Sequence, residues 1–146
     1  MEMNNLIDRM HGHFSGDVTD ILSTSPKRLL VKIRKEALLE ITNYFIDELK
    51  YRFIIATGML TPKGFEIIYH FSDDSNGNII NLSLDLPQDR PEVDSLSNFI
   101  QAADWIEREI NDLFGITFIN HPGGGQFIAD GNWSSDEHPY AERKRK

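Results

Sequence analysis

Two alternating segments joined by a turn around Asn76-Gly77 constrain the fold of this chain more than any other feature. GFEIIYHF (64–71) and IINLSLDL (79–86) each place apolar residues at every second position. These positions are Phe65, Ile67, Tyr69 and Phe71 in the first segment and Ile80, Leu82, Leu84 and Leu86 in the second. Such alternation is typical of antiparallel strands with one buried face, and an Asn-Gly pair readily adopts the positive φ of a tight turn. The sequence therefore predicts a β-hairpin with one apolar side.

Helical periodicity marks two longer segments. Residues 35–50 predict a helix whose apolar positions are Leu38, Ile41, Phe45 and Leu49. Residues 99–113 predict a second helix, whose apolar arc holds Phe99, Ala102, Ala103, Ile106, Ile110 and Leu113. We expect Ser95 or Ser97 to cap this second helix and Gly115 to end it.

Shorter patterns complete the expected order of elements. They predict a helix over 2–12 and strands over 17–23, 28–33 and 52–60. The segment PQDRPEVDS (87–95) contains two prolines, and we expect it to connect elements without regular structure of its own. The mixed order predicts an α+β fold, with helices packed on one face of a mainly antiparallel sheet. We expect one such domain over residues 1–122 and an extended C-terminal arm over residues 123–146.

Composition excludes several classes of function. The formal net charge is -8, and an acidic chain is poorly suited to non-specific nucleic-acid binding, which needs a basic surface. The chain has no cysteine, so disulfides, zinc-thiolate sites and cysteine-ligated iron–sulfur clusters cannot form within it. The N-terminal residues lack the pattern of a signal peptide, and no apolar run is long enough to span a bilayer. We therefore expect an intracellular protein that reaches a membrane only through partners.

A charged arc lies opposite the apolar arc of the 99–113 helix. It holds Asp104, Glu107, Arg108, Asn111 and Asp112, with Trp105 and Glu109 at its border. One explanation is a solvated face with i,i+4 ion pairs, each stabilising the helix by roughly 0.2–0.5 kcal/mol. The alternative is a protein interface, because an arginine beside a tryptophan is typical of binding hot spots. Glu107 and Glu109 are two residues apart and do not face each other, which disfavours a catalytic carboxylate pair.

The remaining reactive residue types predict no catalytic, cofactor or metal site. The histidines, His11, His13, His70, His121 and His138, lack an established metal-binding spacing. The run Gly123-Gly124-Gly125 lacks the frame of a phosphate-binding loop, and no serine lies in a G-x-S-x-G motif. Trp133 is an isolated aromatic residue in a polar segment, where it packs on the domain or anchors in another protein.

The segment DWIEREINDLFGITFINHP (104–122) closely resembles the signature of the complex I 30-kilodalton subunit family, the group formed by the C subunits of NADH:quinone oxidoreductases. That signature reads Trp-hydrophobic-Glu-Arg-Glu, then Asp-hydrophobic-Phe-Gly-hydrophobic, then His-Pro. The matching residues are Trp105, Glu107, Arg108, Glu109, Asp112, Phe114, Gly115, His121 and Pro122. The upstream order of strand, turn, strand, proline-rich connector and helix also follows the family, so the resemblance covers roughly residues 28–143.

The resemblance implies a non-catalytic, cofactor-free scaffold subunit in the hydrophilic arm of a membrane-bound, ion-translocating redox complex. Its expected partners are a small iron–sulfur subunit and the large subunit, which is 49-kilodalton-like in complex I and carries nickel–iron in related hydrogenases. Iron–sulfur clusters and any nickel–iron centre would belong to those partners. The expected location is peripheral, on the cytoplasmic side of the cell membrane, and the charged helix face is then structural or interfacial.

Beyond Pro122 the chain departs from the respiratory members of the family. GGGQFIAD replaces their usual acidic residue, leucine and two arginines. GNWSSDEHPYAERK (131–144) is closer to the W-x-x-D-x-H-P-L-R-K ending of subunits of energy-converting, membrane-bound nickel–iron hydrogenases. By position this ending adds Trp133, His138, Pro139 and Arg143 to the expected partner interface.

The resemblance therefore favours the hydrogenase branch over a complex that passes electrons from NADH or F420H2 to a quinone or phenazine. A different class of function, a free-standing ligand-binding module, remains as an alternative. Its best residues would be the histidines and Glu107 or Glu109.

Overall fold

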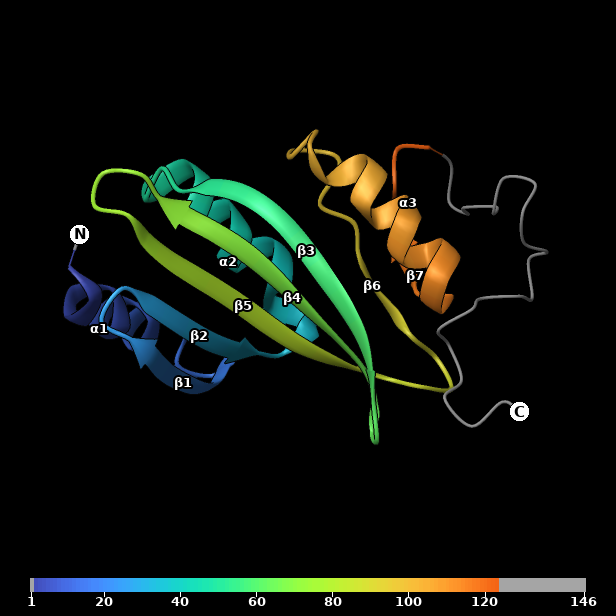
Figure 1. Ribbon diagram of the computed structural model, residues 1–146, viewed down its shortest axis with the longest axis horizontal. Coiled ribbons are helices and arrows are strands. Elements are labelled where there is room, and N and C mark those ends of the chain that lie inside the picture. The colour runs from blue at the N-terminus through green and yellow to red at the C-terminus, as the bar shows by residue number, and fades with distance from the viewer. Residues whose placement is uncertain (1, 124–146) are drawn as a thin grey trace. The chain divides into compact units, whose positions relative to one another are not determined.

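The computed structural model describes residues 2–123, which fall into two compact units (Figure 1). Unit 1 contains residues 2–55 and 68–84, and unit 2 contains residues 56–67 and 85–123. The three long strands β3, β4 and β5 contribute residues to both units.

A five-stranded sheet has the order β1-β2-β5-β4-β3. Its strands are β1 (Val18–Ser25), β2 (Arg28–Ile33), β3 (Arg52–Thr61), β4 (Gly64–Asp73) and β5 (Asn78–Pro87). β1 pairs with β2 antiparallel, and β2 pairs with β5 parallel, with Val31 opposite Leu82. The short connections make the β3/β4 and β4/β5 pairs antiparallel hairpins. The prediction of an α+β fold with a mainly antiparallel sheet is confirmed.

The β4–β5 hairpin follows the alternation in the sequence. Gly77 has φ 78°, and the Asn76 side-chain oxygen accepts a hydrogen bond from the backbone N–H of Asn78 at 3.0 Å. All eight predicted apolar positions are at most 2% exposed. In unit 1, Phe71 packs edge-on against Phe45 with ring centroids 5.3 Å apart. The hairpin face therefore forms the sheet side of the core.

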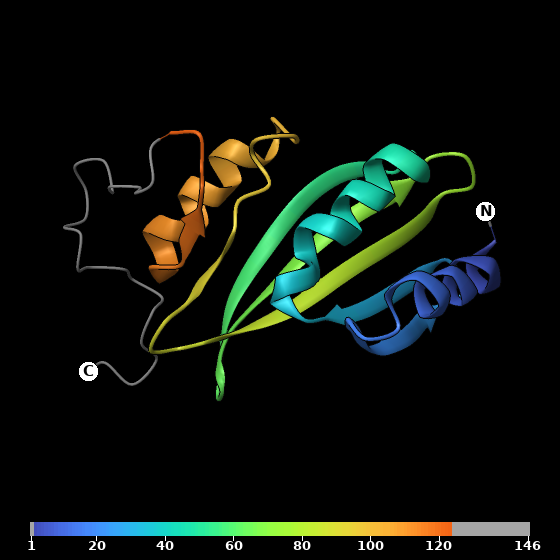
Figure 2. The same ribbon diagram turned by 180° about the vertical axis from the view of Figure 1, so that it is seen from behind.

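The helices of unit 1 lie on one face of the sheet (Figure 2). They are α1 (Met3–Phe14) and α2 (Leu38–Asn43), and α2 is extended by the 3-10 turn η1 (Lys35–Ala37) and the π turn η2 (Tyr44–Glu48). The predicted apolar positions Leu38, Ile41 and Phe45 are buried. The predicted helix over 35–50 is therefore present but not uniform. It ends with the Tyr51 N–H donating to Phe45 O at 2.9 Å and with Lys50 at φ 59°.

Unit 2 contains β6 (Glu92–Asp94), α3 (Ala103–Phe114) and β7 (Thr117–Ile119). β6 and β7 pair in parallel, with Val93 opposite Phe118, and both of these side chains are 2% exposed. The prediction that 87–95 has no regular structure is therefore wrong for β6. A proline lacks only the donor, and the carbonyl oxygen of Pro91 accepts from the Thr117 N–H at 2.9 Å at the start of the ladder.

Candidate functional site

In helix α3 the set of buried side chains differs from the apolar arc that the sequence predicts. Its buried residues are Ala103, Ile106, Glu107, Ile110, Asn111 and Phe114. Because Glu107 and Asn111 are buried, the first explanation of the charged arc, a solvated face, does not hold for these two residues. Phe99 and Ala102, predicted for the apolar arc, precede the helix, and Phe99 is 37% exposed.

The carboxylate of Glu107 is enclosed by a loop, here called the serine loop, residues 95–97. Glu107 is 1% exposed, and its Oε1 accepts from the hydroxyls of Ser95 and Ser97, each at 2.7 Å. Its Oε2 accepts from the Leu96 N–H at 2.8 Å. The prediction that Ser95 or Ser97 caps the helix is therefore wrong, because both hydroxyls bind a side chain inside the helix, and the cap residue Ala102 has no side-chain cap.

Burial and hydrogen bonding act in opposite directions on Glu107. Burial raises the pKa of its carboxyl group above the ordinary value, although the Ser95, Leu96 and Ser97 donors and His121 oppose the shift. An ionised carboxylate without such donors would cost several kcal/mol in this position. The serine loop supplies them, and so ties the segment after β6 to α3.

His121 extends the polar network along α3. Its side chain is 1% exposed, its Nδ1 accepts from the Gly123 N–H at 2.9 Å, and its Nε2 lies 2.7 Å from Asp104 Oδ1. Since Nδ1 acts as an acceptor, a neutral imidazole carries its proton on Nε2, the ring nitrogen nearer Asp104. Nε2 also lies 3.9 Å from Glu107 Oε1. The His-Pro end of the signature therefore folds back onto the helix.

Arg108 contacts the same carboxylate from the solvent side. Its Nε donates to Asp104 Oδ1 at 3.0 Å, which confirms the predicted i,i+4 pair. Burial alone would raise the pKa of Asp104. The hydrogen bond and charge of Arg108, together with His121, outweigh this effect and hold the pKa of Asp104 below its ordinary value. A Cβ atom at Gly123 would lie 2.6 Å from Arg108 Nη2. Asp104, Arg108, His121 and Gly123 thus form one compact cluster at the surface of unit 2.

Phe114 and Gly115 have structural roles at the end of α3. Phe114 is 8% exposed and meets Phe65 edge-on at 5.9 Å, and a Cβ atom at Gly58 would lie 3.1 Å from its ring. Gly115 ends the helix in the left-handed region with φ 76°, as predicted, and its N–H donates to Asn111 O at 2.8 Å.

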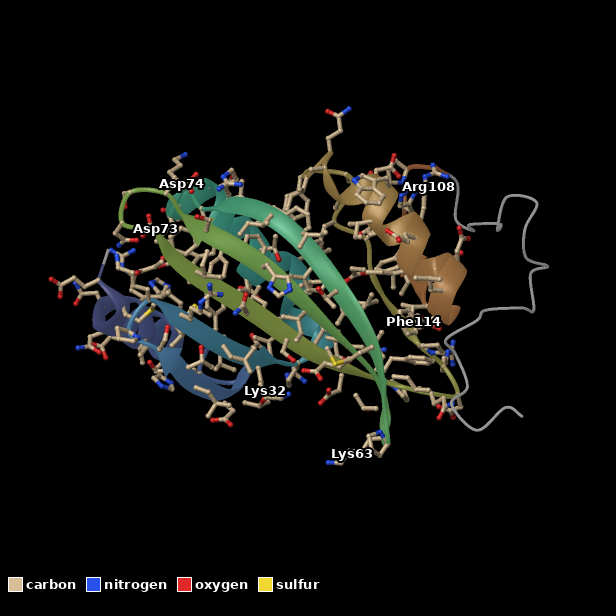
Figure 3. All side chains as sticks on the ribbon, in the orientation of Figure 1. Lys32, Lys63, Asp73, Asp74, Arg108 and Phe114 are labelled. Carbon is tan, nitrogen blue, oxygen red and sulfur yellow. The ribbon has the colours of Figure 1, made fainter. Side chains whose placement is uncertain are left out.

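The remaining signature residues form an outer surface, here called the α3 outer face: Trp105, Arg108, Glu109, Asp112 and Pro122. Trp105 is 62% exposed and the Arg108 side chain 49% exposed. Glu109 and Pro122 are exposed, and Asp112 is half-buried. Figure 3 shows Arg108 extending from α3, with Phe114 nearer the other end of the helix. An exposed tryptophan beside a fixed guanidinium is well suited to bind another protein.

The described residues bring together no catalytic pair. Glu107 is buried and Glu109 is exposed, so the two carboxylates cannot act on one substrate. His11 and His13 lie within α1 rather than in an extended segment, and His70 Nδ1 lies 2.7 Å from the side-chain oxygen of Asn81. Within residues 2–123 no group of three histidine or acidic side chains is placed to hold a metal ion. Trp133, His138, Pro139 and Arg143 lie outside the described residues.

Comparison with known families matches residues 31–144 to the family described as respiratory-chain NADH dehydrogenase, 30 Kd subunit. One similar protein is the C subunit of the NADH-quinone oxidoreductase of Citrifermentans bemidjiense, which is 27% identical over 136 residues, 90% of this chain and 84% of the relative. Another is the C subunit of the F(420)H(2) dehydrogenase of Methanosarcina mazei, 28% identical over 125 residues, 84% of this chain and 79% of the relative.

Two solved structures share the fold. A trypsin-resistant fragment of Nqo5 superimposes with a TM-score of 0.72 at 20% identity, covering 84% of this chain and 98% of the fragment. A chain of the membrane-bound sulfane sulfur reductase, an archaeal respiratory membrane complex, gives a TM-score of 0.72 at 15% identity, covering 81% of this chain and 71% of that chain.

Proposed function

Because the chain belongs to the family of the 30-kilodalton subunit of respiratory-chain NADH dehydrogenase, we propose that it is a cofactor-free structural subunit of a membrane-associated redox complex. In this role it docks through the α3 outer face on the large subunit of that complex. A small iron–sulfur subunit is the second partner, and the redox cofactors belong to the partners.

One observation carries this proposal: the family signature divides into an internal half and an exposed half. Glu107 and His121 are at most 4% exposed, whereas Trp105 is 62% exposed. Tryptophan and arginine are enriched among the residues that contribute most to protein–protein binding, and here the two lie three residues apart on one exposed helix face. The exposed half therefore supports a docking role for the signature.

The internal half gives the outer face its rigidity. Glu107 fixes α3 to the serine loop, and Asp104 holds the Arg108 guanidinium at 3.0 Å. Side chains that are already ordered lose less entropy on binding, so a preorganised face binds more tightly than a mobile one.

Two branches of the proposal differ in the metal content of the large subunit. The names of the relatives above favour a dehydrogenase branch, in which NADH or F420H2 donates electrons that reach a quinone or phenazine. The W-x-x-D-x-H-P pattern at 133–139 favours the branch of energy-converting nickel–iron hydrogenases. Nickel in the assembled complex separates them.

We further propose a peripheral position on the cytoplasmic side of the membrane, held by the partner subunits. Among residues 2–123 no helix combines the length and the apolar character needed to cross a bilayer. The archaeal respiratory membrane complex that contains a chain of the same fold provides a precedent for such an assembly.

The test is native affinity purification from the source cell with a tag at Met1, followed by mass spectrometry and metal analysis. We expect a large subunit and iron–sulfur subunits to copurify in fixed ratio. Nickel in the complex would assign the hydrogenase branch, and iron without nickel the dehydrogenase branch. Recovery of the chain without any partner would contradict the docking proposal.

A further inference from the structure

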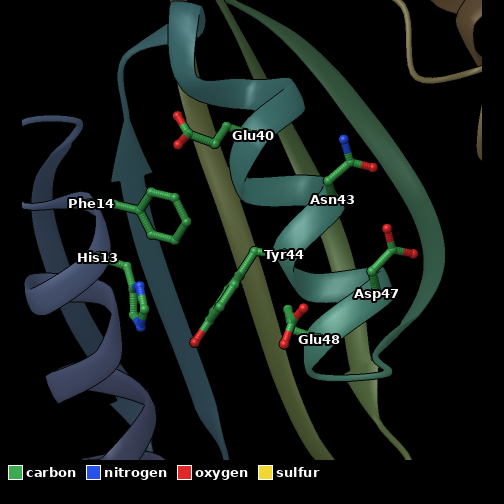
Figure 4. Close-up of a pocket in the computed structure, with 7 residues that line it drawn as sticks. All are labelled: His13, Phe14, Glu40, Asn43, Tyr44, Asp47 and Glu48. Carbon is green, nitrogen blue, oxygen red and sulfur yellow. The ribbon is translucent and has the colours of Figure 1, made fainter.

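Unit 1 contains an open hollow of about 310 Å³ between the end of α1 and the helical segment formed by α2 and η2. His13 and Phe14 line it from α1, and Glu40, Tyr44 and Glu48 line it from the other side. Figure 4 shows the Tyr44 ring directed from the helical segment toward His13 and Phe14 of α1. None of these residues belongs to the α3 outer face or to the polar cluster around His121.

The aromatic rings of the hollow hold one another in place. The Tyr44 ring centroid lies 5.1 Å from that of His13 and 5.4 Å from that of Phe14, the latter edge-on at 76°. Arg9 donates a hydrogen bond from Nη1 to the Tyr44 hydroxyl oxygen at 3.1 Å. Tyr44 is therefore fixed at its hydroxyl end and by its neighbours, so its ring is already ordered to receive a ligand.

The rim of the hollow carries three carboxylates without a matching cation. Glu40, Asp47 and Glu48 are exposed, and within residues 2–123 none of them forms an ion pair. Glu40, Tyr44 and Glu48 follow one another at intervals of four residues and share one face of the helical segment. The C-terminal end of α1 adds its partial negative charge on the opposite side. Arg9 keeps its charge when it donates to the neutral Tyr44 hydroxyl, so the three carboxylates outnumber this one guanidinium and the rim keeps an excess of negative charge that favours a positive ligand.

We propose that this hollow binds an arginine side chain of a partner polypeptide. A guanidinium is planar, stacks on an aromatic ring and donates several hydrogen bonds to carboxylates, which matches an ordered tyrosine bordered by Glu40 and Glu48. A volume of about 310 Å³ is at the lower end for a ligand site and suits one long side chain. Its open form lets a side chain enter from the surface of another protein. The inference goes beyond docking through α3 and does not depend on it.

The test uses the isolated full-length chain, labelled with nitrogen-15, and N-acetylarginine amide as the probe. We expect saturable chemical-shift changes centred on His13, Tyr44 and Glu48, with a dissociation constant in the millimolar range. N-acetylcitrulline amide has nearly the same shape without the charge, and we expect it to bind at least tenfold more weakly. Replacing both Glu40→Gln and Glu48→Gln is expected to weaken arginine binding at least fivefold.

Glu36→Gln is the matched control for the two carboxylates. Glu36 is an exposed residue of the same helical stretch, lies outside the hollow and approaches Arg34 at 3.9 Å. We expect this variant to bind the probe as the unmodified chain does. Equal binding of the arginine and citrulline probes, equal weakening by Glu36→Gln, or shifts spread over the acidic surface instead of the hollow would each overturn the proposal. These outcomes are independent of whether the α3 outer face binds the large subunit.

Discussion

At the scale of single residues, Glu107 shows how one charged position organises a helix and the loop that packs on it. Its carboxylate receives hydrogen bonds from Ser95, Leu96 and Ser97, all between 2.7 and 2.8 Å. These bonds replace the water that the charge loses on burial. The cost of removing Glu107 is therefore set by the donors that are left behind in the core.

We predict that Glu107→Ala lowers the free energy of unfolding by about 3 kcal/mol, because the two serine hydroxyls and the Leu96 N–H lose their acceptor. Urea denaturation of the isolated chain measures this change. Glu109→Ala is the control, since Glu109 is exposed on the same helix, and we expect it to change stability by less than about 0.5 kcal/mol. Equal effects of the two variants would show that Glu107 is not an internal anchor.

The raised pKa of Glu107 predicts a pH dependence of stability. Because the folded-state pKa lies above the ordinary value of 4.5, folding favours the protonated form, so the contribution of Glu107 declines as the pH rises from about 4.5 through the folded-state pKa. We therefore expect the stability of the unmodified chain, relative to Glu107→Gln, to decrease over this window. The expected decrease is tested by measuring the free energy of unfolding of both chains between pH 4 and 8, at intervals of about half a pH unit. A relative stability that rises with pH would contradict the sign.

At the scale of elements, the glycine at the end of α3 and the glycine within α1 are expected to respond in opposite ways. Gly115 has φ 76°, so Gly115→Ala should destabilise the chain by about 1–2 kcal/mol. Gly12 lies inside α1, and a Cβ atom there would meet nothing within 4 Å, so Gly12→Ala should stabilise by about 0.5–1 kcal/mol. Thermal unfolding of both variants tests the pair, and a stabilised Gly115→Ala would contradict the role of Gly115 as a helix cap.

The elements that could be predicted are those whose pattern is local and repeated. The β4–β5 hairpin is confirmed at each of its alternating positions, because both strands and their turn lie within 64–86. β6 was missed because a three-residue strand carries little pattern, and its partner β7 is more than twenty residues away. The π turn at Tyr44–Glu48 was missed because the apolar spacing of an α-helix continues into it unchanged.

The candidate site was predictable as a set of residues but not as an arrangement. A helical wheel places Glu107 and Asn111 among charged neighbours, and it cannot show that their side chains turn inward. The sequence feature that could have indicated a buried Glu107 is Ser95-Leu96-Ser97, which lies ten to twelve residues earlier and offers two hydroxyls and one backbone N–H as donors. The contact of His121 with Asp104 depends on the return of β7 beside α3, which no short pattern encodes.

At the scale of the whole molecule, replacing Arg108 distinguishes a residue needed for docking from a residue needed for folding. Its ion pair with Asp104 has side chains 49% and 45% exposed, and exposed pairs contribute about 1 kcal/mol or less. We predict that the melting temperature of the isolated Arg108→Ala chain stays within a few degrees of that of the unmodified chain, because only an exposed ion pair is lost. The same variant should reduce copurification of the large subunit. A collapse of the fold would instead assign the guanidinium to the internal architecture.

Docking through the α3 outer face is tested by comparing Trp105→Ala with Leu22→Ala in the native complex. Both residues are large exposed apolar side chains, 62% and 46% exposed, and Leu22 belongs to β1 and is not one of the signature residues. With each variant tagged at Met1, quantitative mass spectrometry measures how much of the large subunit is recovered per mole of this chain. We predict at least a tenfold loss for Trp105→Ala and full recovery for Leu22→Ala, since truncating a tryptophan that is buried in an interface typically costs about 2 kcal/mol or more, roughly a thirtyfold change in affinity. Full recovery of the large subunit with Trp105→Ala would contradict docking through the α3 outer face.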